Sequence, residues 1–412
     1  MIDNQTIENM LKKRNREDYQ REFFDNFLNH IKFNYKVPSI HITGTNGKGS
    51  TAFYLSSIYQ NAGYIVGSFT SPSVDTINDM ILINGKPISN EDFYSYLEKY
   101  ENDFDKYNIS VFEIQTFIAL SYFQDQKCDI AIIECGMGGL LDATNIFNPI
   151  LSIITSVSIE HTAYLGKSIC EIALNKAGII KENIPVLVGD LSDEALKTIS
   201  QVALENDSKI YKISDANNVE IVGEGYSFGY LNLSNLYIPT LAKYSIKDAQ
   251  IAIDAVSILK DQFNIRNENI VEGLRTSKIP LRMEKIRDFP TIYLDGAHNP
   301  EAMHNLVESL SDILGERKLN VVFCCFKDKN IERMLANIGS IADSITLTTF
   351  NNPRAREKFD YFLFLDEYKY NENCVESIMD YINLNDDSII LITGSFAFAA
   401  YMRKLFKENK IC

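Results

Sequence analysis

The sequence predicts an α/β protein with a larger N-terminal and a smaller C-terminal domain, each built on a mostly parallel β-sheet. The chain has 412 residues, and at roughly 150 residues per domain this predicts two or three domains. A composition of 45% hydrophobic and 23% charged residues can bury sizeable cores and is not that of a disordered chain. Short β-rich runs alternate with longer helical stretches, which is typical of a parallel sheet covered by helices.

The charge and cysteine pattern exclude several classes of protein. Lys and Arg number 40 against 55 Asp and Glu, and a net charge of −15 argues against general nucleic-acid binding. Binding of a small anionic ligand is still compatible with this net charge, because backbone amides, a lysine and a metal can make the electrostatic potential inside one cleft positive. No apolar run reaches the ~18 residues of a membrane helix, and the N-terminus lacks the apolar core of a secretion signal. The seven cysteines form no C-x-x-C pair, so we expect reduced thiols in a cytoplasmic protein, which we take to be a monomer.

The first domain begins with a strand, a glycine-rich turn and a helix. Pro38–Thr43 has the pattern of a buried strand, and a helix is expected from about Ser50 to Asn61. Continuous apolar runs predict further strands at Tyr64–Thr70, Asp129–Cys135, Ile150–Val157 and Pro185–Val188. Helices are expected between them, notably at Glu91–Asn102 and Ile114–Phe123.

The pattern changes after this series. Asn217–Pro239 alternates apolar and polar residues, which predicts a small antiparallel hairpin set at the edge of the first domain, followed by a helix at about Ile246–Asp261. Thr276–Arg282 carries a proline and no periodicity, so we place the domain junction there, giving domains of residues 1–279 and 280–412. A second α/β series follows, with strands predicted at Thr291–Leu294, Asn320–Phe326, Ile345–Thr348 and Ser388–Thr393.

The turn between the first strand and its helix predicts a phosphate-binding loop. It consists of Gly44, Thr45, Asn46, Gly47, Lys48, Gly49, Ser50 and Thr51. Glycines let successive N–H groups converge on phosphate oxygens, Lys48 adds a full charge, and the hydroxyls can contact phosphate or Mg²⁺. The alternative is an ordinary turn with a solvated lysine. The strand, the helix and the framing glycines favour ATP binding.

The motif TGTNGKGST resembles the signature of the folylpolyglutamate synthase and dihydrofolate synthase family, within the muramyl-ligase superfamily of ATP-dependent amide-forming ligases. The resemblance runs from about Pro38 to about Arg403. It implies a P-loop ATPase-like N-terminal domain, a smaller Rossmann-like C-terminal domain and an active site in the cleft between them. The implied reaction joins a folate carboxylate to L-glutamate through an acyl phosphate, and the same chemistry would join dihydropteroate to glutamate.

A metal site is expected beside this loop. Glu134 ends an apolar strand, where α/β sheets place their ligands, and could hold Mg²⁺; alternatively it bonds the amides of the glycine-rich turn that follows. We expect His161 to end the next strand, beside Glu134 in the sheet. By resemblance, Ser71 and Glu134 are metal ligands, His161 binds a second Mg²⁺, and Lys176 is a lysine converted to a carbamate. Composition alone would make Lys176 an ordinary helix-surface residue.

The resemblance also assigns residues of the second domain. It makes Arg282 and Asp295 contacts of ATP and places His298 on the substrate side of the cleft, although Asp295 and Asn299 could instead stabilise a turn. Thr393–Ser395 matches the region near the incoming glutamate. Lys48, His161, Lys176 and His298 are then the expected catalytic residues.

Two motifs depart from the family pattern. The family loop H-L-x-x-x-x-E-R-I appears as Ser73–Ile81, with Asp79-Met80 in place of Glu-Arg, and Asp248 replaces an asparagine that contacts the nucleotide. Two alternatives therefore stay open: a Mur-type ligase acting on a non-folate carboxylate, or a nucleotide-binding protein without ligase activity.

Overall fold

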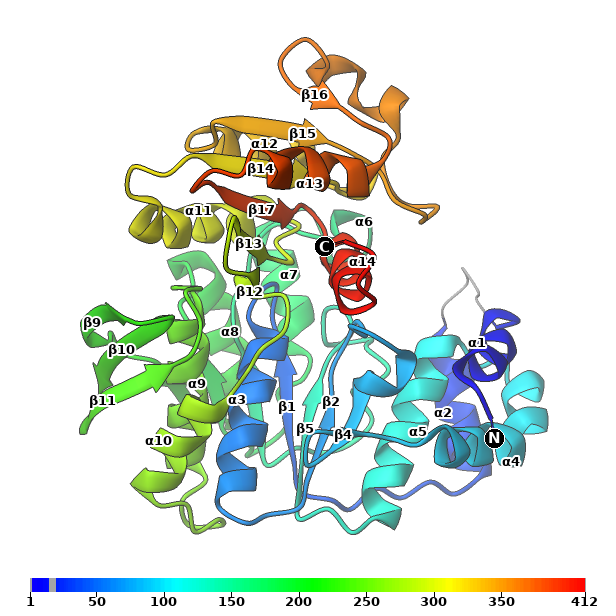
Figure 1. Cartoon of the computed structure of the whole chain (residues 1–412). Coiled ribbons are helices and arrows are strands. Elements are labelled where there is room, and N and C mark those ends of the chain that lie inside the picture. The colour runs from blue at the N-terminus through cyan, green and yellow to red at the C-terminus, as the bar shows by residue number, and fades with distance from the viewer. Residues whose placement is uncertain (1, 15–19, 412) are drawn as a thin grey trace. The chain divides into compact units, whose positions relative to one another are not determined.

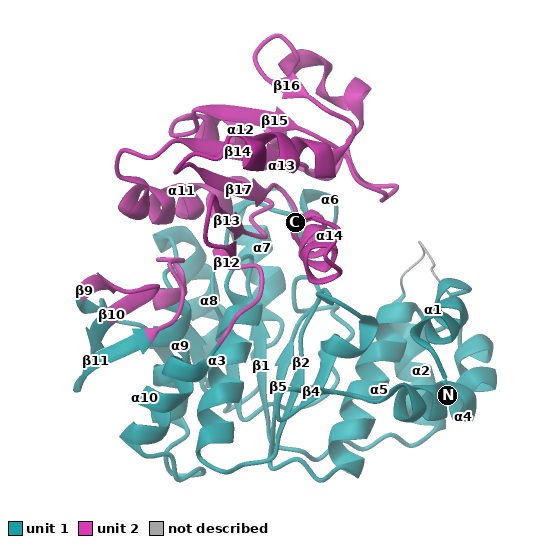
Figure 2. Ribbon diagram, in the orientation of Figure 1, with its two compact units in different colours: residues 1–218, 228–237, 247–277 teal, residues 219–227, 238–246, 278–412 magenta. Residues whose placement is uncertain are grey.

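The computed structural model describes residues 2–14 and 20–411, which group into two compact units. Unit 1 comprises residues 1–218, 228–237 and 247–277, and unit 2 comprises residues 219–227, 238–246 and 278–412 (Figure 2). The chain thus passes between the units several times before residue 278, and from there on it stays in unit 2.

Unit 1 is built on a mostly parallel sheet, as the sequence predicted. Within the described residues this sheet has eight strands, whose order is β4 (Lys86–Pro87), β3 (Ile81–Ile83), β2 (Val66–Phe69), β5 (Ile130–Glu134), β1 (Ser39–Thr43), β6 (Leu151–Ile154), β7 (Val186–Val188) and β8 (Ile210–Lys212). β3 pairs antiparallel with β2 and β4, and the other pairs are parallel. β1 and β5 are buried along their whole length, as expected for strands covered on both faces.

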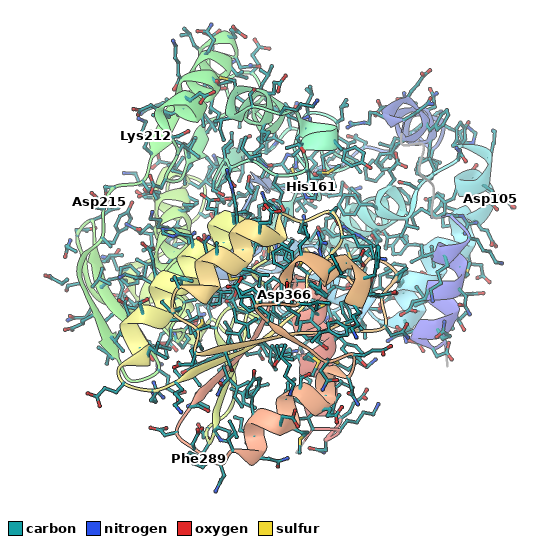
Figure 3. The ribbon with its side chains drawn as sticks, turned by 90° about the horizontal axis from the view of Figure 1, so that it is seen from above. Asp105, His161, Lys212, Asp215, Phe289 and Asp366 are labelled. Carbon is teal, nitrogen blue, oxygen red and sulfur yellow. The ribbon has the colours of Figure 1, made fainter. Side chains whose placement is uncertain are left out.

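Helices cover this sheet with their apolar faces. α1 (Asn4–Lys12), α2 (Arg21–His30), α4 (Asn90–Lys106) and α5 (Val111–Asp125) contribute to one core cluster, rich in phenylalanine. α7 (Ile169–Ala177) and α8 (Asp193–Glu205) contribute to another. α3 (Lys48–Asn61) follows β1 and packs against α10 (Asn267–Thr276), as can be followed in Figure 1. Charged side chains such as Asp105 and Lys212 lie at the periphery of unit 1 (Figure 3).

The alternating segment near residue 220 forms a sheet of its own. Its described strands are β9 (Asn217–Val222), β10 (Gly225–Tyr230) and β11 (Leu233–Ile238), with β10 in the middle. Residues of this sheet are shared between the two units, and α9 (Ser245–Ile258) follows it. On its inner side, the Tyr230 hydroxyl donates a hydrogen bond to Asp254 of α9 at 2.7 Å.

Unit 2 repeats the α/β architecture on a smaller scale. The strand order of its described sheet is β12 (Glu284–Arg287), β13 (Thr291–Leu294), β17 (Ile389–Thr393), β14 (Leu319–Phe323), β15 (Ser344–Leu347) and β16 (Lys369–Tyr370), parallel except for β12. Its helices are α11 (Pro300–Leu314), α12 (Ile331–Gly339), α13 (Cys374–Asn383) and α14 (Phe396–Lys407). In the described part of the chain, no helix combines the length and the apolar character that crossing a membrane requires.

Candidate active site

The glycine-rich loop between β1 and α3 is held from behind by the segment that follows β6. The Thr45 amide donates to the carbonyl of Ser156 at 3.0 Å, and the Asn46 amide donates to the Ser156 hydroxyl at 2.8 Å. Thr155 Oγ1 donates to the carbonyl of Asn46 at 2.6 Å. These bonds join the loop to the segment after β6 and stabilise its shape.

The polar groups of this loop are only partly used by the protein itself. Lys48 Nζ donates to the carbonyls of Gly44 at 3.0 Å and Thr45 at 3.2 Å. Ser50 Oγ and Thr51 Oγ1 are buried and have no hydrogen-bond partner among the residues that the structure describes. Both hydroxyls lie in the first turn of α3, where they could contact a phosphate or a metal ion.

Gly47 and Asp248 meet at the turn of the loop. Gly47 has φ +84°, a conformation that favours glycine, and a Cβ there would lie 2.3 Å from Asp248 Oδ1. The Asp248 side chain, 6% exposed, therefore packs directly against the loop backbone. No larger residue can replace Gly47 without moving this carboxylate.

Glu134 and Ser71 lie together beside the loop. Glu134 ends β5, the neighbour of β1, and its Oε2 accepts a hydrogen bond from the Ser71 amide at 3.2 Å. A Cβ on Gly49 would lie 3.4 Å from the same oxygen. The structure therefore gathers the glycine-rich loop, Glu134 and Ser71 at one strand end, as α/β sheets do with their ligand sites.

His161 does not occupy the position expected from the sequence. β6 ends at Ile154, and β1 separates β6 from β5, so the expectation that His161 ends a strand beside that of Glu134 is wrong. The chain leaves the sheet early because Thr155, Ser156 and Ser158 bond the glycine-rich loop. His161 instead precedes the short helix α6 (Thr162–Leu165), with φ +50°.

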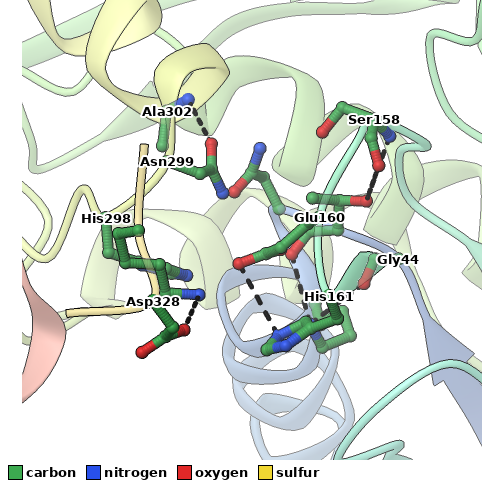
Figure 4. A network of polar contacts seen from close by, with 12 residues as sticks. Gly44, Ser158, Glu160, His161, His298, Asn299, Ala302 and Asp328 are labelled. Atoms are coloured by element: carbon green, nitrogen blue, oxygen red, sulfur yellow. Dashed lines mark hydrogen bonds and ion pairs between the residues drawn. The ribbon is translucent and has the colours of Figure 1, made fainter. Parts of the chain in front are cut away.

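Glu160 is a residue that the sequence reading missed. Its Oε1 lies 3.7 Å from His161 Nε2, and its side chain is only 8% exposed (Figure 4). It also acts electrostatically on Lys176, whose pKa it tends to raise. The one signal in the sequence is that this carboxylate directly precedes His161.

Lys176 is buried, so the expectation from composition of an exposed helix lysine is wrong. It is 2% exposed and lies in the last turn of α7. Burial, together with the charge of Lys48, lowers the pKa of Lys176 from 10.5 to about 7. The neutral form of this amine is therefore easier to reach near pH 7 than it is for an exposed lysine.

The residues present fit a hard divalent cation at the loop. Among the described residues, no three His, Cys, Asp or Glu side chains gather into a metal cluster. The Glu134 carboxylate and the unpartnered Ser50 and Thr51 hydroxyls are nevertheless oxygen donors, the type that Mg²⁺ prefers, and a nucleotide would add phosphate oxygens. A site completed by substrate needs no preformed trio of protein carboxylates.

The segment after Glu134 forms a loop fixed by a buried network. Asp142 Oδ2 accepts from the Met137 amide at 2.8 Å, and Asp142 Oδ1 accepts from Thr144 Oγ1 at 2.6 Å. His41 Nε2 lies 2.8 Å from Thr144 Oγ1, and burial lowers the pKa of His41 to about 3. His41 is therefore neutral, and the network presents the exposed apolar residues Leu140 and Leu141 at the surface.

The loop that departs from the family pattern is stabilised by its own carboxylate. Asp79 Oδ2 accepts from the amides of Asp75 at 2.8 Å and Thr76 at 2.9 Å, which begins the short helix η1 (Ile77–Met80). Met80 is buried in the phenylalanine-rich core. Asp79 and Met80 thus serve folding, and no charge from this pair replaces an arginine.

In unit 2, the carboxylate in the turn after β13 is hydrogen-bonded within the protein. Asp295 is 1% exposed and accepts from the Tyr244 hydroxyl at 2.6 Å and from the amides of Met283 and Ala297, both at 2.9 Å. Burial raises the pKa of Asp295, while the charge of Arg282 acts to lower it. Asn299 caps α11 by accepting from Ala302 (Figure 4). This is the turn-stabilising arrangement that the sequence left open.

The other residues of unit 2 predicted to belong to the site are His298 and Arg282, which lie near this turn, and Ser395, which caps α14. His298 Nδ1 lies 2.9 Å from the carbonyl of Gly296, and the guanidinium of Arg282 stacks 5.7 Å from the ring centroid of Phe396. Ser395, in the predicted glutamate region, accepts from Phe398 at 3.1 Å and caps α14.

Comparison with known proteins relates these features to a family. Residues 42–253 match the Mur ligase middle domain, and residues 281–396 match the Mur ligase glutamate ligase domain. The chain is 34% identical over 392 residues to the dihydrofolate synthase/folylpolyglutamate synthase of Bacillus subtilis, covering 90% of this chain and 91% of that protein.

Solved structures agree over nearly the whole chain. A Mycobacterium tuberculosis folylpolyglutamate synthase complexed with ADP and AMPPCP superposes with a TM-score of 0.89 at 26% identity, covering 98% of each chain. Escherichia coli FolC in complex with DHPP and ADP gives a TM-score of 0.88 at 25% identity, covering 99% of this chain and 98% of that one. The resemblance seen in the motifs is confirmed: the chain belongs to the folylpolyglutamate synthase/dihydrofolate synthase family of Mur ligases.

Proposed function

We propose that the protein is an ATP-dependent ligase that joins the carboxylate of a folate, or of a folate polyglutamate, to the amino group of L-glutamate. The observation that carries the proposal is the preformed loop of residues 44–51, with Lys48 held over it and two buried hydroxyls unpartnered within the described chain. A loop of this construction suits a triphosphate, and the relatives include a synthase structure with ADP and AMPPCP.

The residues of the loop have separate tasks in the first chemical step. A carboxylate is a poor acyl donor, and transfer of the γ-phosphoryl group makes it an acyl phosphate with phosphate as leaving group. Lys48 would leave the loop carbonyls and neutralise charge on the moving phosphoryl group, and the N-terminus of α3 would hold the neighbouring phosphates. The glutamate amine then attacks the acyl carbon and phosphate departs.

Magnesium is the expected cofactor, held by Glu134, by Ser71 and by a hydroxyl of the loop. A bound Mg²⁺ would screen the charge that accumulates on the phosphates. His161 and Lys176 are proposed for a second ion, and Arg282 and Asp295 of unit 2 for ATP, with His298 on the substrate side. Asp295 is buried and hydrogen-bonded to Tyr244. This supports a role in positioning the surrounding turn more directly than a contact with the nucleotide.

Lys176 is proposed to become a carbamate. Only a neutral amine adds to CO₂, and the lowered pKa of Lys176 supplies this form near neutral pH. The product is an anion that would relieve the repulsion from Lys48. ¹³C-NMR in ¹³C-bicarbonate should show a carbamate carbon that is absent from Lys176→Met and still present in Lys197→Met, an exposed lysine on α8. An identical spectrum for wild type and Lys176→Met would remove the proposal.

The acceptor is tested by phosphate release. With MgATP, release should require L-glutamate and a reduced folate together, and a second set of reactions with dihydropteroate would show whether both ligations occur. Because Asp79 and Met80 leave the loop without a basic side chain, a non-folate carboxylate is the alternative acceptor. Release with such an acceptor alone would favour the alternative, and acceptor-independent hydrolysis would favour a nucleotide-binding protein without ligase activity.

A further inference from the structure

A groove on unit 1 lies outside the residues assigned above. It has a volume of about 560 Å³, within the roughly 300–1,000 Å³ of small-molecule sites. Its walls come from α2, from the segment that leads into β6 and from Lys181 after α7. Most of its exposed lining is polar, and Phe33, Ile146 and Phe147 add a smaller apolar part.

Two positively charged side chains line this groove, and they differ in how many hydrogen-bond and ion-pair partners they have. Arg21 forms an ion pair with Asp25 at 2.8 Å and donates to the carbonyls of Asp142 at 2.9 Å and Asn145 at 2.8 Å. The Lys181 side chain makes no ion pair within the described residues, and its one hydrogen bond there is long, 3.5 Å from Nζ to the carbonyl of Gly178. Lys181 is therefore a partly buried lysine without a carboxylate partner in a chain whose net charge is −15.

The pKa of Lys181 indicates that its ammonium group lacks a negatively charged partner. Burial and the charge of Arg21 both lower the pKa of Lys181, so its ammonium form is held at a cost. An anion in the groove would remove that cost, and its apolar part could contact Phe33 and Ile146. Asp25, the carboxylate among the described lining residues, is engaged by Arg21 and therefore opposes an anion only weakly.

We infer that this groove binds a small organic anion, one carboxylate or phosphate group on an apolar body, with Lys181 as its charge partner. The site is distinct from the loop of residues 44–51, and the inference rests on unit 1 alone rather than on the ligase reaction. Arg21 connects it to the active site, because the backbone that Arg21 holds belongs to the segment in which Asp142 fixes the Met137 amide.

The test uses benzoate as the probe and the methyl group of Ile146 as the reporter. The full chain, ¹³C-labelled at isoleucine methyl groups, is titrated with benzoate, with its neutral counterpart benzamide and with inorganic phosphate. Benzoate should shift the Ile146 signal with saturation, and benzamide should bind at least about tenfold more weakly, since charge carries the recognition. If inorganic phosphate binds more tightly than benzoate, the anionic group of the ligand is a phosphate.

Variants decide whether Lys181 is the partner. Lys181→Met and Lys181→Gln should each weaken benzoate binding at least about tenfold, whereas Lys197→Met should leave it unchanged. Asp25→Asn should tighten benzoate binding, because it releases Arg21 from its ion pair. This variant tests the anion site without altering Lys181, and unchanged or weaker binding would count against the inference. Equal binding of benzoate and benzamide, no saturable shift, or unchanged affinity in both Lys181 variants would overturn the inference, whatever the outcome of the ligase assays.

Discussion

The strand ends of the two units carry charged turns of opposite character. After β1 in unit 1, Lys48 is bonded only to carbonyls of its own loop in the described structure, and the Ser50 and Thr51 hydroxyls have no partner there. After β13 in unit 2, the Asp295 carboxylate accepts hydrogen bonds from Tyr244, Met283 and Ala297. The first turn therefore has polar groups available to a ligand, whereas the carboxylate of the second is engaged within the protein. Ligand binding and structural stability should therefore separate between the two units.

The strongest way to break this comparison is Lys48→Ala. If the lysine serves a phosphate rather than the fold, turnover should fall about 10³-fold while the unfolding transition stays in place. Phosphate release with MgATP, glutamate and reduced folate measures the first effect, and far-ultraviolet circular dichroism measures the second. Lys197→Ala is the matched control and should behave like the wild type. Undiminished turnover in Lys48→Ala would show that the loop does not act on phosphate.

Asp295→Ala should behave in the opposite way. It leaves the buried Tyr244 hydroxyl and two amides without their acceptor, so the free energy of unfolding should fall by about 3 kcal/mol. Urea unfolding followed by tyrosine fluorescence suits a chain without tryptophan. Asp288→Ala, which removes an exposed carboxylate near the start of β13, should change little. A variant of normal stability that binds ATP poorly would instead make Asp295 a direct nucleotide contact.

Thr51→Val sharpens the comparison inside unit 1. Because the Thr51 hydroxyl has no partner in the described chain, its loss should not destabilise the protein, yet KM for ATP should rise roughly tenfold. Thr144→Val is the matched control: its hydroxyl bonds Asp142 and lies 2.8 Å from His41, so stability should drop by about 2 kcal/mol. Equal losses of stability in the two variants would contradict the assignment of Thr51 to a ligand.

Measured per pH unit, the pH dependence of stability is the smallest of these effects. Lys176 has a pKa of about 7 in the folded chain, against 10.5 when unperturbed, so the unfolded state binds more protons between these values. The free energy of unfolding should therefore rise with pH across that window, by at most about 1.4 kcal/mol per unit. Urea unfolding without bicarbonate should show a flatter profile for Lys176→Met. A profile that Lys176→Met leaves unchanged would mean that Lys176 keeps its proton.

Much of the fold and part of the site were predictable from local patterns. Continuous apolar runs identified the strands around β1 and β5, and glycines framing one lysine identified the loop, because both signals lie within a few neighbouring residues. His161 was misplaced, because hydrogen bonds from Thr155 and Ser156 to a loop more than a hundred positions away end the strand early. The effect of Glu160 on Lys176 was not predictable, because Lys176 belongs to α7 and folding brings the two side chains together.

The sequence by itself determined that the chain forms α/β sheets and carries a glycine-rich loop at a strand end, since periodicity and turn chemistry are local properties. Only the tertiary structure decided which charged groups are satisfied. Lys176 and Lys181 look alike along the chain, yet one is buried near Lys48 and the other lines a groove beside Arg21. Burial and the distance to other charges set the state of an amine, and both arise from residues brought together by folding.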